Sequence, residues 1–536
     1  MAHSSQIVVR LEGGRVVGVS RVADGRETPV EVGGGGACEV LARLAAERRE
    51  ARIAWLEREL EPRLLPVARW PALLRHDLDL LHLGLAPAEE RAVASLGLVD
   101  FDSPFVLPRP AGRPYASWLI SPRGGIASAA ALRAAGVDRR LASLPLALLD
   151  LGRRGAERGL CPRVEPRLWR DREADGGEEA GQGVRGHQLA ALIRRGYGRK
   201  WLAFWLLGRL LHERRPPLVA ALRGALAPAP PPVDEAALAA LAPPPGPVPA
   251  GRQALTAVVP TLGRPESVAE LLHDLAAQGA RPARVVVVEQ RPEPPHASEL
   301  GALAAGDWPF ELRLLTVPWA GACRARNRAF DELAGDWVLL LDDDVRLRAF
   351  AIARLIGVAR AYGVAAVNAC VHLPQQDPAA LAGGVLPRPW PAFASGAALV
   401  ARPAVEAAGG FDPRLDGGFG EDYDFGLRLR RAGGEVLYDP GTPVEHRKAP
   451  AGGLRSPYPH PWRDDPLPPK PSPTVLLSRR LHHPPAMLLG YKLFYHLGRL
   501  RRTPPWRWPA EIRRLRRQWR SAQRWCDHLN ARGPMP

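Results

Sequence analysis

The sequence predicts an α/β fold for residues 253–450, and three observations support that prediction. Strand-like and helix-like segments alternate through this region. An apolar strand, Trp337–Leu341, runs directly into the acidic triplet Asp342-Asp343-Asp344. Polar residues also stand where other predicted strands end. Because ligands of open α/β sheets bind outside the carboxyl ends of the strands, we expect these side chains to line one crevice.

The predicted elements follow one another without a long interruption. The strands are predicted at 254–259, 284–288, 310–317, 337–341 and 395–400, and the helices at 266–278, 324–334 and 423–432. Alternation of this kind is typical of a mainly parallel central sheet covered by helices.

Length and composition indicate further domains, because 536 residues exceed what one hydrophobic core usually organises. Residues 227–252 are rich in Pro and Ala and are predicted to form a linker. The linker separates residues 1–226 from the α/β region, and residues 451–536 are predicted to form a Pro-rich loop and a basic helical tail. Within the first part, a helix is expected at 38–61.

Charge and cysteine content restrict the class of protein. The net charge of +17 favours polyanionic partners, but no recognised nucleic-acid-binding module is present, so nucleic acid is not expected as a partner. The five cysteines form no Cys-x-x-Cys pair, which fits a reducing compartment. Met1–Glu12 lacks an apolar signal core. We expect a cytoplasmic protein. The basic tail is compatible with peripheral attachment to an anionic membrane surface, on the inner face, and packing of its apolar side on the α/β domain is the alternative that we favour.

The acidic triplet has two interpretations. Carboxylates crowded at a strand end repel one another unless a cation lies among them, and hard oxygen ligands suit Mg²⁺ or Mn²⁺. The competing interpretation is a solvated acidic turn that closes the strand. The flanking motifs favour the metal site.

Five motifs occur in an order that resembles a known family. They are Pro260-Thr261-x-x-Arg264, Glu289 after a Val run, Gly321-x-x-x-x-Arg326-Asn327, Asp342-x-Asp344, and Gly420-Glu421-Asp422-Tyr423-Asp424. Their order and spacing resemble the inverting family 2 glycosyltransferases with a GT-A fold, over residues 254–446. The resemblance implies a nucleotide-diphospho-sugar transferase fold.

The resemblance also implies roles for these residues. Contacts to the nucleotide sugar are expected from Pro260, Thr261, Arg264, Glu289, Arg326, Asn327, Asp342 and Asp343. Mn²⁺ or Mg²⁺ is expected at Asp342, Asp344 and His446. For Arg326 a structural ion pair is the alternative, and for His446 a purely structural role. Glu289 stands where the family usually has an aspartate, so the identity of the nucleobase in the donor stays open.

The catalytic residues implied by the resemblance open the last predicted helix. Inverting transfer requires one base to remove the proton of the acceptor hydroxyl. Asp422 is the expected base, and Glu421 is expected to position the acceptor. The alternative is that both carboxylates only cap the N-terminus of the helix, where the helix dipole favours negative charge.

The function implied is a metal-dependent, hexosyltransferase-type glycosyltransferase. It would transfer a sugar from a nucleoside-diphosphate sugar to a hydroxyl acceptor, which could be a glycan, a lipid-linked glycan or a small molecule. The biological setting would be cell-surface polysaccharide or natural-product glycoside synthesis. A non-catalytic scaffold that binds glycan or a partner protein is the alternative, and the intact carboxylates argue against it.

The N-terminal part contains a segment similar in sequence to part of the α/β region. Residues 136–141 resemble residues 410–415, and at the same offset Asp150 falls on Asp424. Glu421 and Asp422 fall on Ala147 and Leu148, and His446 falls on Arg172. We expect residues 1–226 to be a degenerate GT-A-like domain that arose by tandem duplication. Chance similarity in an Ala- and Arg-rich sequence is the competing explanation.

Overall fold

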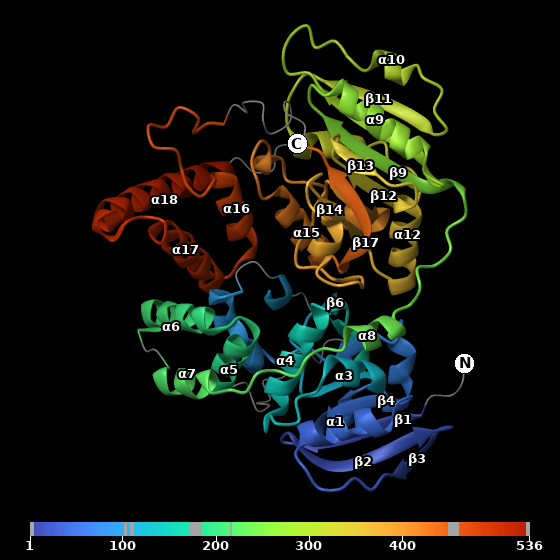
Figure 1. Cartoon of the computed structure of the whole chain (residues 1–536), viewed down its shortest axis with the longest axis vertical. Coiled ribbons are helices and arrows are strands. Elements are labelled where there is room, and N and C mark those ends of the chain that lie inside the picture. Colours follow the sequence, from blue (N-terminus) through green and yellow to red (C-terminus); the bar gives the residue numbers. More distant parts are fainter. Residues whose placement is uncertain are drawn as a thin grey trace. The chain divides into compact units, whose positions relative to one another are not determined.

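The computed structural model divides the chain into two compact units (Figure 1). It describes residues 5–100, 104–107, 112–170, 185–214, 217–448 and 460–531. Unit 1 comprises Met1–Pro243 and Pro485–Tyr491, and unit 2 comprises Pro244–Pro484 and Lys492–Pro536. The boundary therefore falls inside the predicted linker.

The first part of that linker is fixed to unit 1. Helix α8 (Glu235–Leu241) buries Leu238 completely, and the Asp234 amide donates to the Ala134 carbonyl at 2.8 Å. The high proline content led us to expect a free linker. The composition alone does not show that its backbone carbonyls accept hydrogen bonds from unit 1.

Unit 2 is built on a mixed sheet, which has nine strands among the described residues. The strands are β9 (Gly251–Thr261), β10 (Ala280–Gln290), β11 (Glu311–Val317), β12 (Trp337–Leu341), β13 (Val345–Leu347), β14 (Ala366–His372), β15 (Arg388–Pro389), β16 (Ala397–Ala401) and β17 (Val436–His446). Their order is β11-β10-β9-β12-β16-β14-β17-β13, with β15 also paired to β17. The first four strands pair in parallel, and β16 runs antiparallel to both β12 and β14.

Helices of unit 2 cover this sheet, and others form the tail, of which Pro485–Tyr491 belongs to unit 1. They are α9 (Pro265–Ala276), α10 (Gly301–Ala304), α11 (Ala322–Phe330), α12 (Ala351–Tyr362), α13 (Pro378–Ala382), α14 (Arg402–Ala408), α15 (Glu421–Arg431), α16 (Pro473–His482), α17 (Pro485–Leu500) and α18 (Trp508–Ala531). The predicted α/β fold with a helical tail is confirmed. Tail helix α16 contacts α15 and buries Leu476 and Leu477.

The central strand β12 is buried because its sequence is apolar throughout. Val338–Leu341 are at most 1% exposed and lie between β9 and β16. Fully buried strands of parallel sheets read as continuous apolar runs, which is why this element was predictable.

Unit 1 also has a mixed sheet, with eight strands among its described residues. The strands are β1 (Gln6–Glu12), β2 (Arg15–Ala23), β3 (Arg26–Pro29), β4 (Arg52–Glu57), β5 (Asp79–His82), β6 (Tyr115–Ala116), β7 (Gly124–Ser128) and β8 (Cys161–Val164). The helices, besides α8, are α1 (Ala37–Glu47), α2 (Pro87–Val93), α3 (Ala129–Ala135), α4 (Leu144–Ala156), α5 (Gly186–Gly196), α6 (Arg199–Glu213) and α7 (Leu218–Ala225).

The helix expected at 38–61 is wrong in its second half. Helix α1 ends at Glu47, and the buried residues Ile53, Ala54 and Trp55 belong to strand β4. Arg and Glu residues on both sides gave the segment a helical appearance, while β4 is held by its neighbours β1 and β7 in the sheet.

The two sheets share a common strand order. Unit 1 has β1-β4-β7-β5-β8-β6, and unit 2 has β9-β12-β16-β14-β17 with β15 paired to β17. Each neighbouring pair has the same relative direction in both units: parallel, antiparallel, antiparallel, parallel and antiparallel. Outside this shared core, unit 1 has the hairpin strand β2 where unit 2 has the parallel strand β10.

Throughout the described ranges, each helix is either too short or too polar to cross a lipid bilayer.

Candidate active site

The acidic triplet lies where β12 ends, at the edge where β9 and β10 also end. Strand β12 is parallel to β9, and β9 to β10, so their carboxyl ends meet. The Asp342 amide donates to the Gly396 carbonyl at 3.0 Å, which keeps the chain next to β16 as it leaves the sheet. The three carboxylates are nevertheless not equivalent.

Asp343 is buried and holds the end of β9 and the loop that follows it. Its carboxylate accepts hydrogen bonds from Thr261 Oγ1 at 2.7 Å and Arg264 Nη1 at 2.6 Å. Burial raises the pKa of Asp343 to about 6, although the Arg264 guanidinium and the Thr261 hydroxyl oppose this shift. Thr261 is therefore engaged with the acidic triplet, and Arg264 also lies 3.2 Å from Asp344 Oδ2.

Asp342, Asp344 and His446 form a group that could hold a metal ion. One ligand atom from each residue lies within 4.8 Å of the others. His446 comes from the end of β17, opposite Val345 of β13, and its Nε2 lies 3.1 Å from Asp344 Oδ1. The hydrogen bond to Asp344 raises the pKa of His446. Two carboxylates and one imidazole suit a divalent cation such as Mn²⁺ or Mg²⁺.

Arg326 is a buried cation beside these carboxylates. It lies on α11, its side chain is 5% exposed, and its Nη2 donates to Asp342 Oδ1 at 2.9 Å. Its Nε and Nη1 find no hydrogen-bond partner among the described residues. Since buried donors are rarely left without an acceptor, these two groups are available to an anionic ligand in the site.

Glu421 and Asp422 open helix α15 after Gly420, whose φ of +115° turns the chain into the helix. Asp422 Oδ1 accepts from the Ser395 hydroxyl at 2.5 Å and from the Ser395 amide at 3.2 Å. This carboxylate is therefore held by the β16 side of the site rather than used as a helix cap. Burial, opposed by the Arg326 charge, raises the pKa of Asp422.

Glu421 faces the cavity, and its Oε2 is buried without a partner among the described residues. Burial and the neighbouring Asp422 carboxylate together raise the pKa of Glu421 to about 7. Both adjacent carboxyl groups therefore have raised pKa values, as is common for groups that take part in proton transfer.

A cavity of about 560 Å³ joins these groups. Of the predicted site residues, it is lined by Pro260, Arg264, Arg326, Asp342, Asp343, Asp344, Glu421 and His446. Its size lies in the range of ordinary ligand pockets. Thr261 and Asp422 are not among the lining residues, and their side chains hydrogen-bond to Asp343 and Ser395, respectively.

Comparison with known proteins agrees with this geometry. Residues 256–384 match the family described as Glycosyl transferase family 2. Unit 2 contains a glycosyl transferase family 2 domain. A curated relative, the succinoglycan biosynthesis protein ExoM of Rhizobium meliloti (strain 1021), is 31% identical over 194 residues, which cover 34% of this chain and 62% of that protein. The match thus spans less than two thirds of the relative.

Solved structures of low sequence identity are also similar to the chain. S. aureus TarS residues 1–349 in complex with UDP-GlcNAc is 13% identical with a TM-score of 0.36, over 51% of this chain and 83% of that one. The mannosyltransferase PcManGT from Pyrobaculum calidifontis, in complex with GDP-Man and Mn²⁺, is 18% identical with a TM-score of 0.31, over 50% and 76%.

Two predicted donor-binding residues of the family 2 domain lie outside the cavity wall. Glu289 is 3% exposed and accepts from Ser298 Oγ at 2.5 Å and from the Glu299 amide at 2.7 Å. Asn327 exchanges two hydrogen bonds with the Phe411 backbone. Both side chains fix loops around the site.

Other cavity residues were missed by the sequence analysis. Gln290 accepts from the Gly321 amide at 2.7 Å, and Asp416 accepts from the Cys323 amide at 2.6 Å and from Arg324 Nε at 2.9 Å. Gln290 directly follows the strand-end residue Glu289, so its position was a usable signal. The Gly-rich run at 417–420 was a second such signal, since it marks a loop of unusual backbone conformation.

The helical tail supports the loop and helix that carry Glu421 and Asp422. His482 Nε2 lies 2.7 Å from Asp424 Oδ1, and the Tyr423 hydroxyl lies 2.6 Å from His483 Nε2. A Cβ on Gly418 would come within 2.2 Å of Thr474 Oγ1, so the loop packs directly on α16. Packing of the tail's apolar side on the α/β domain was the favoured expectation, and α16 packs there, next to the loop at 417–420.

Proposed function

We propose that unit 2 is a metal-dependent, inverting glycosyltransferase that transfers a sugar from a nucleoside-diphosphate sugar to a hydroxyl acceptor. The observation that carries this proposal is one cavity lined by three kinds of group: a potential metal ligand set, a buried Arg326 with two available donors, and the Glu421 carboxyl. The family 2 domain assignment supports the same chemistry.

The donor diphosphate fits the side of the cavity that Asp342, Asp344 and His446 share with Arg326. A divalent cation held there would neutralise the charge that develops on the leaving nucleoside diphosphate. Arg326 can donate Nε and Nη1 to donor oxygens while its Nη2 remains bonded to Asp342. ExoM is named for succinoglycan biosynthesis, and both solved complexes contain nucleotide sugars, which supports a donor of this class.

The acceptor hydroxyl requires a base on the opposite side of the sugar. The Asp422 carboxylate is fixed by two hydrogen bonds from Ser395, and Glu421 lies on the cavity wall beside it. We assign proton removal to Asp422 and orientation of the acceptor to Glu421. In-line attack by the hydroxyl then inverts the anomeric centre. Polysaccharide or glycoside synthesis is the setting that the ExoM relation supports.

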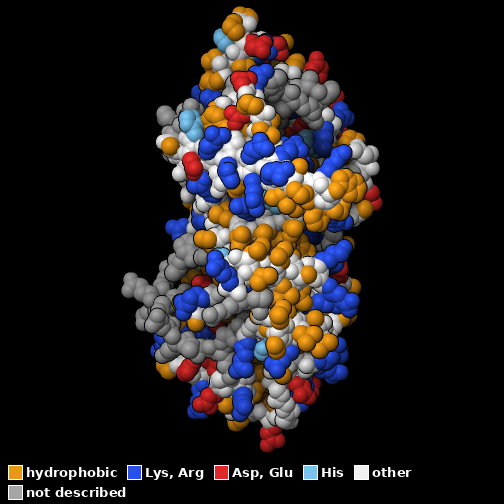
Figure 2. All heavy atoms as spheres, turned by 90° about the vertical axis from the view of Figure 1, so that its left-hand side faces the viewer, with side chains coloured by type: hydrophobic (Ala, Val, Ile, Leu, Met, Phe, Trp, Pro, Cys, Tyr) orange, Lys and Arg blue, Asp and Glu red, His pale blue; other side chains and the backbone are white. Residues whose placement is uncertain are grey.

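A membrane-bound acceptor is compatible with the surface of the tail. Phe494, Leu497, Trp506 and Trp508 expose large apolar side chains, and Lys and Arg side chains lie among them on the face that carries α17 and α18 (Figure 2). Apolar side chains with surrounding cations suit peripheral binding to an anionic lipid surface. Sedimentation with vesicles containing phosphatidylglycerol, compared with vesicles of phosphatidylcholine alone, tests this placement.

The experiment for the proposed function combines a binding screen with a transfer assay. Nucleoside-diphosphate sugars are screened by thermal shift with Mn²⁺, with Mg²⁺ and with EDTA, and stabilising donors are then tested for transfer or slow hydrolysis. We expect stabilisation that requires the metal. If no nucleotide sugar shifts the melting temperature with either cation, the proposal is wrong, and the non-catalytic scaffold becomes the better explanation.

A further inference from the structure

The supporting residues of the active site recur in unit 1 with the same contacts. In unit 2, Arg414 Nε donates to Asp412 at 3.0 Å, and Arg428 Nε donates to Asp424 at 2.9 Å. At the same sequence offset in unit 1, Arg140 Nε donates to Asp138 at 2.9 Å, and Arg154 Nε donates to Asp150 at 2.9 Å. The equivalent residues in units 1 and 2 are Asp138 and Asp412, Arg140 and Arg414, Asp150 and Asp424, and Arg154 and Arg428.

Further details repeat as well. Arg154 also donates to the carbonyls of Ala135 and Gly136 at the end of α3, and Arg428 donates to the Ala408 carbonyl at the end of α14. Chance similarity between Ala- and Arg-rich segments does not explain shared contacts combined with a shared six-strand order. We propose that unit 1 is a second copy of the unit 2 fold, in which the donor crevice is replaced by apolar core and the remaining ion pairs hold the segment at 227–232.

The charged groups of the donor crevice have been replaced together. Helices α1 and α11 both follow an N-cap glycine and begin Ala-Cys, which aligns Leu41 with Arg326. Ala147 and Leu148 align with Glu421 and Asp422. Leu41, Ala147 and Leu148 are each 1% exposed and belong to one hydrophobic cluster. Losing the cation and both carboxylates leaves no buried charge unpaired.

The strand ends of unit 1 have also changed. Leu56 of β4 pairs with Gly124 as Leu341 of β12 pairs with Ala397, so residues 57–59 align with the acidic triplet. Glu57 accepts hydrogen bonds from the Gly13 and Gly14 amides at 3.1 and 2.9 Å. These glycines form the β1–β2 turn, which occupies the place of the loop after β9. Arg172, the counterpart of His446, lies outside the described residues.

The loop before the catalytic pair is absent from unit 1. In unit 2, residues 417–419 line the cavity before α15 begins at Glu421. In unit 1, α4 begins at Leu144, and Ser143 caps it by accepting from the Leu146 amide. Leu144 and Pro145, which correspond to Gly418 and Phe419 at the same offset, are therefore helical.

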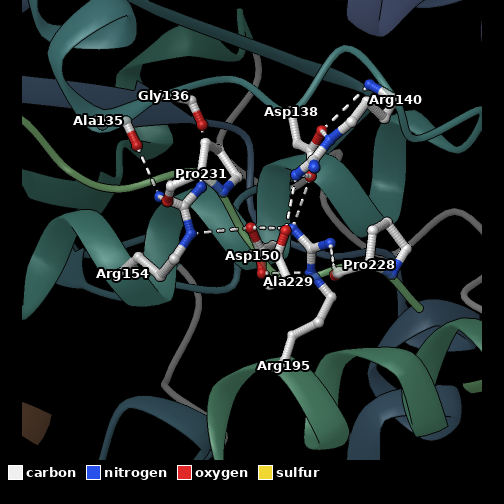
Figure 3. Close-up of polar contacts among 10 residues, drawn as sticks. All are labelled: Ala135, Gly136, Asp138, Arg140, Asp150, Arg154, Arg195, Pro228, Ala229 and Pro231. Carbon is white, nitrogen blue, oxygen red and sulfur yellow. Dashed lines mark hydrogen bonds and ion pairs between the residues drawn. The ribbon is translucent and has the colours of Figure 1, made fainter. Parts of the chain in front are cut away.

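Arg195 takes the position that His482 holds in unit 2 (Figure 3). His482 of α16 contacts Asp424, and Arg195 of α5 donates to Asp150 Oδ1 at 2.9 Å. The guanidinium is larger, so it reaches two further acceptors, Asp138 Oδ2 at 2.9 Å and the Pro228 carbonyl at 2.7 Å. Its side chain is 1% exposed.

The connecting segment is bound by all three arginines of this cluster. Arg195, Arg140 and Arg154 donate to the carbonyls of Pro228, Ala229 and Pro231, respectively, at 2.7, 2.6 and 3.1 Å. Proline carbonyls accept well but have no amide beside them, so a Pro-rich segment suits a site made only of donors. Groups that support catalysis in unit 2 thus organise the chain in unit 1.

The holding role is tested with a nitroxide at Ala229→Cys in the full chain. All five native cysteines are buried, so the new thiol is labelled selectively. We expect a restricted spectrum in the parent, a mobile one with Arg195→Met, and no change with Arg199→Met, an exposed arginine on α6. Equal spectra for the parent and Arg195→Met would overturn the holding role. This readout is independent of whether unit 2 is a transferase.

The equivalence of the two units is tested with Arg195→His. A histidine can keep the contact to Asp150, as His482 does with Asp424, so its melting temperature should lie between those of the parent and Arg195→Met. An equal fall in melting temperature in both variants would contradict the equivalence.

The loss of the donor crevice from unit 1 rests on the proposed function and is tested by the binding of UDP and GDP in the presence of Mn²⁺. One nucleotide per chain is expected, and two would overturn the loss, whereas none would count against the proposed function alone.

Discussion

Unit 1 and unit 2 have the same strand order around β4 and β12. They also share the Asp–Arg pairs before and within α4 and α15. The residues at the positions of the unit 2 cavity nevertheless differ in chemistry. Unit 2 places Arg326, Glu421 and the acidic triplet around a cavity. Unit 1 places Leu41, Ala147 and Leu148 in a hydrophobic cluster.

The difference shows that the supporting contacts and the reactive groups are separable. The pairs Asp138–Arg140 and Asp412–Arg414 close the turn after α3 and α14 in the same way, whatever lies in the crevice. Burial opposes ionisation of Asp138, but the hydrogen bonds from Arg140 and Arg195 lower its pKa to about 2. These ion pairs stabilise the fold whether or not a reactive site lies beside them.

The largest expected effect comes from returning a carboxylate to unit 1. Leu148→Asp places a charge in an apolar cluster with no cation at position 41. An uncompensated buried charge typically costs about 3–5 kcal/mol. Urea denaturation of unit 1 should show this loss, with Leu148→Met as the control of similar volume. A variant as stable as the parent would mean that the unit 1 crevice is still open to water.

Removing the proposed base from unit 2 comes next. Asp422→Asn keeps the size and the contact to Ser395 but removes the proton acceptor. The transfer rate should fall by about a hundredfold or more, while donor affinity stays within a few-fold. Leu148→Ala, the counterpart in unit 1, should leave the rate per folded molecule unchanged. Transfer by Asp422→Asn at the parent rate would exclude Asp422 as the base.

The pH profile distinguishes a buried acid pair from an exposed cap. A base must be ionised to act, and the pKa of Glu421 is raised to about 7, with that of Asp422 raised as well. The rate should therefore fall as the pH decreases through the raised pKa values of this pair, by roughly tenfold per unit in the limiting slope. Measured kcat/KM that stays flat down to pH 5 would mean ordinary carboxyl pKa values.

The smallest effect concerns metal affinity. Because Asp344 raises the pKa of His446, protons compete with the cation for the imidazole. Affinity for Mn²⁺ should weaken as the pH falls through that raised pKa, by at most about tenfold per unit. His446→Ala should bind Mn²⁺ more weakly and lose this dependence. An unchanged dependence in His446→Ala would remove His446 from the ligand set.

Much of unit 2 was predictable because its apolar strands end in polar or charged residues. The apolar run before Asp342 and the order of the motifs led to the correct fold and to the cavity residues Arg264, Arg326 and Glu421. Glu289 and Asn327 do not line the cavity, because their side chains hydrogen-bond to Ser298 and to the Phe411 backbone, and Phe411 is 84 residues from Asn327 in the sequence. No local pattern encodes such contacts.

In unit 1 the sequence was less informative, for a physical reason. The offset that relates Asp150 to Asp424 was visible because each aspartate pairs with an arginine four residues later, and such buried ion pairs are costly to break one partner at a time. Strand β4 was hidden by flanking Arg and Glu residues. The role of Arg195 could not be predicted, since its three acceptors, Asp138, Asp150 and Pro228, come from different segments.

The most direct test of the whole account is a calorimetric titration of UDP and GDP in the presence of Mn²⁺. The parent, Asp344→Ala and Glu59→Ala are compared, because Glu59 holds in unit 1 the register position that Asp344 holds in unit 2. We predict one nucleotide per chain for the parent and for Glu59→Ala, and no Mn²⁺-dependent binding for Asp344→Ala. Undiminished Mn²⁺-dependent binding by Asp344→Ala would contradict the account.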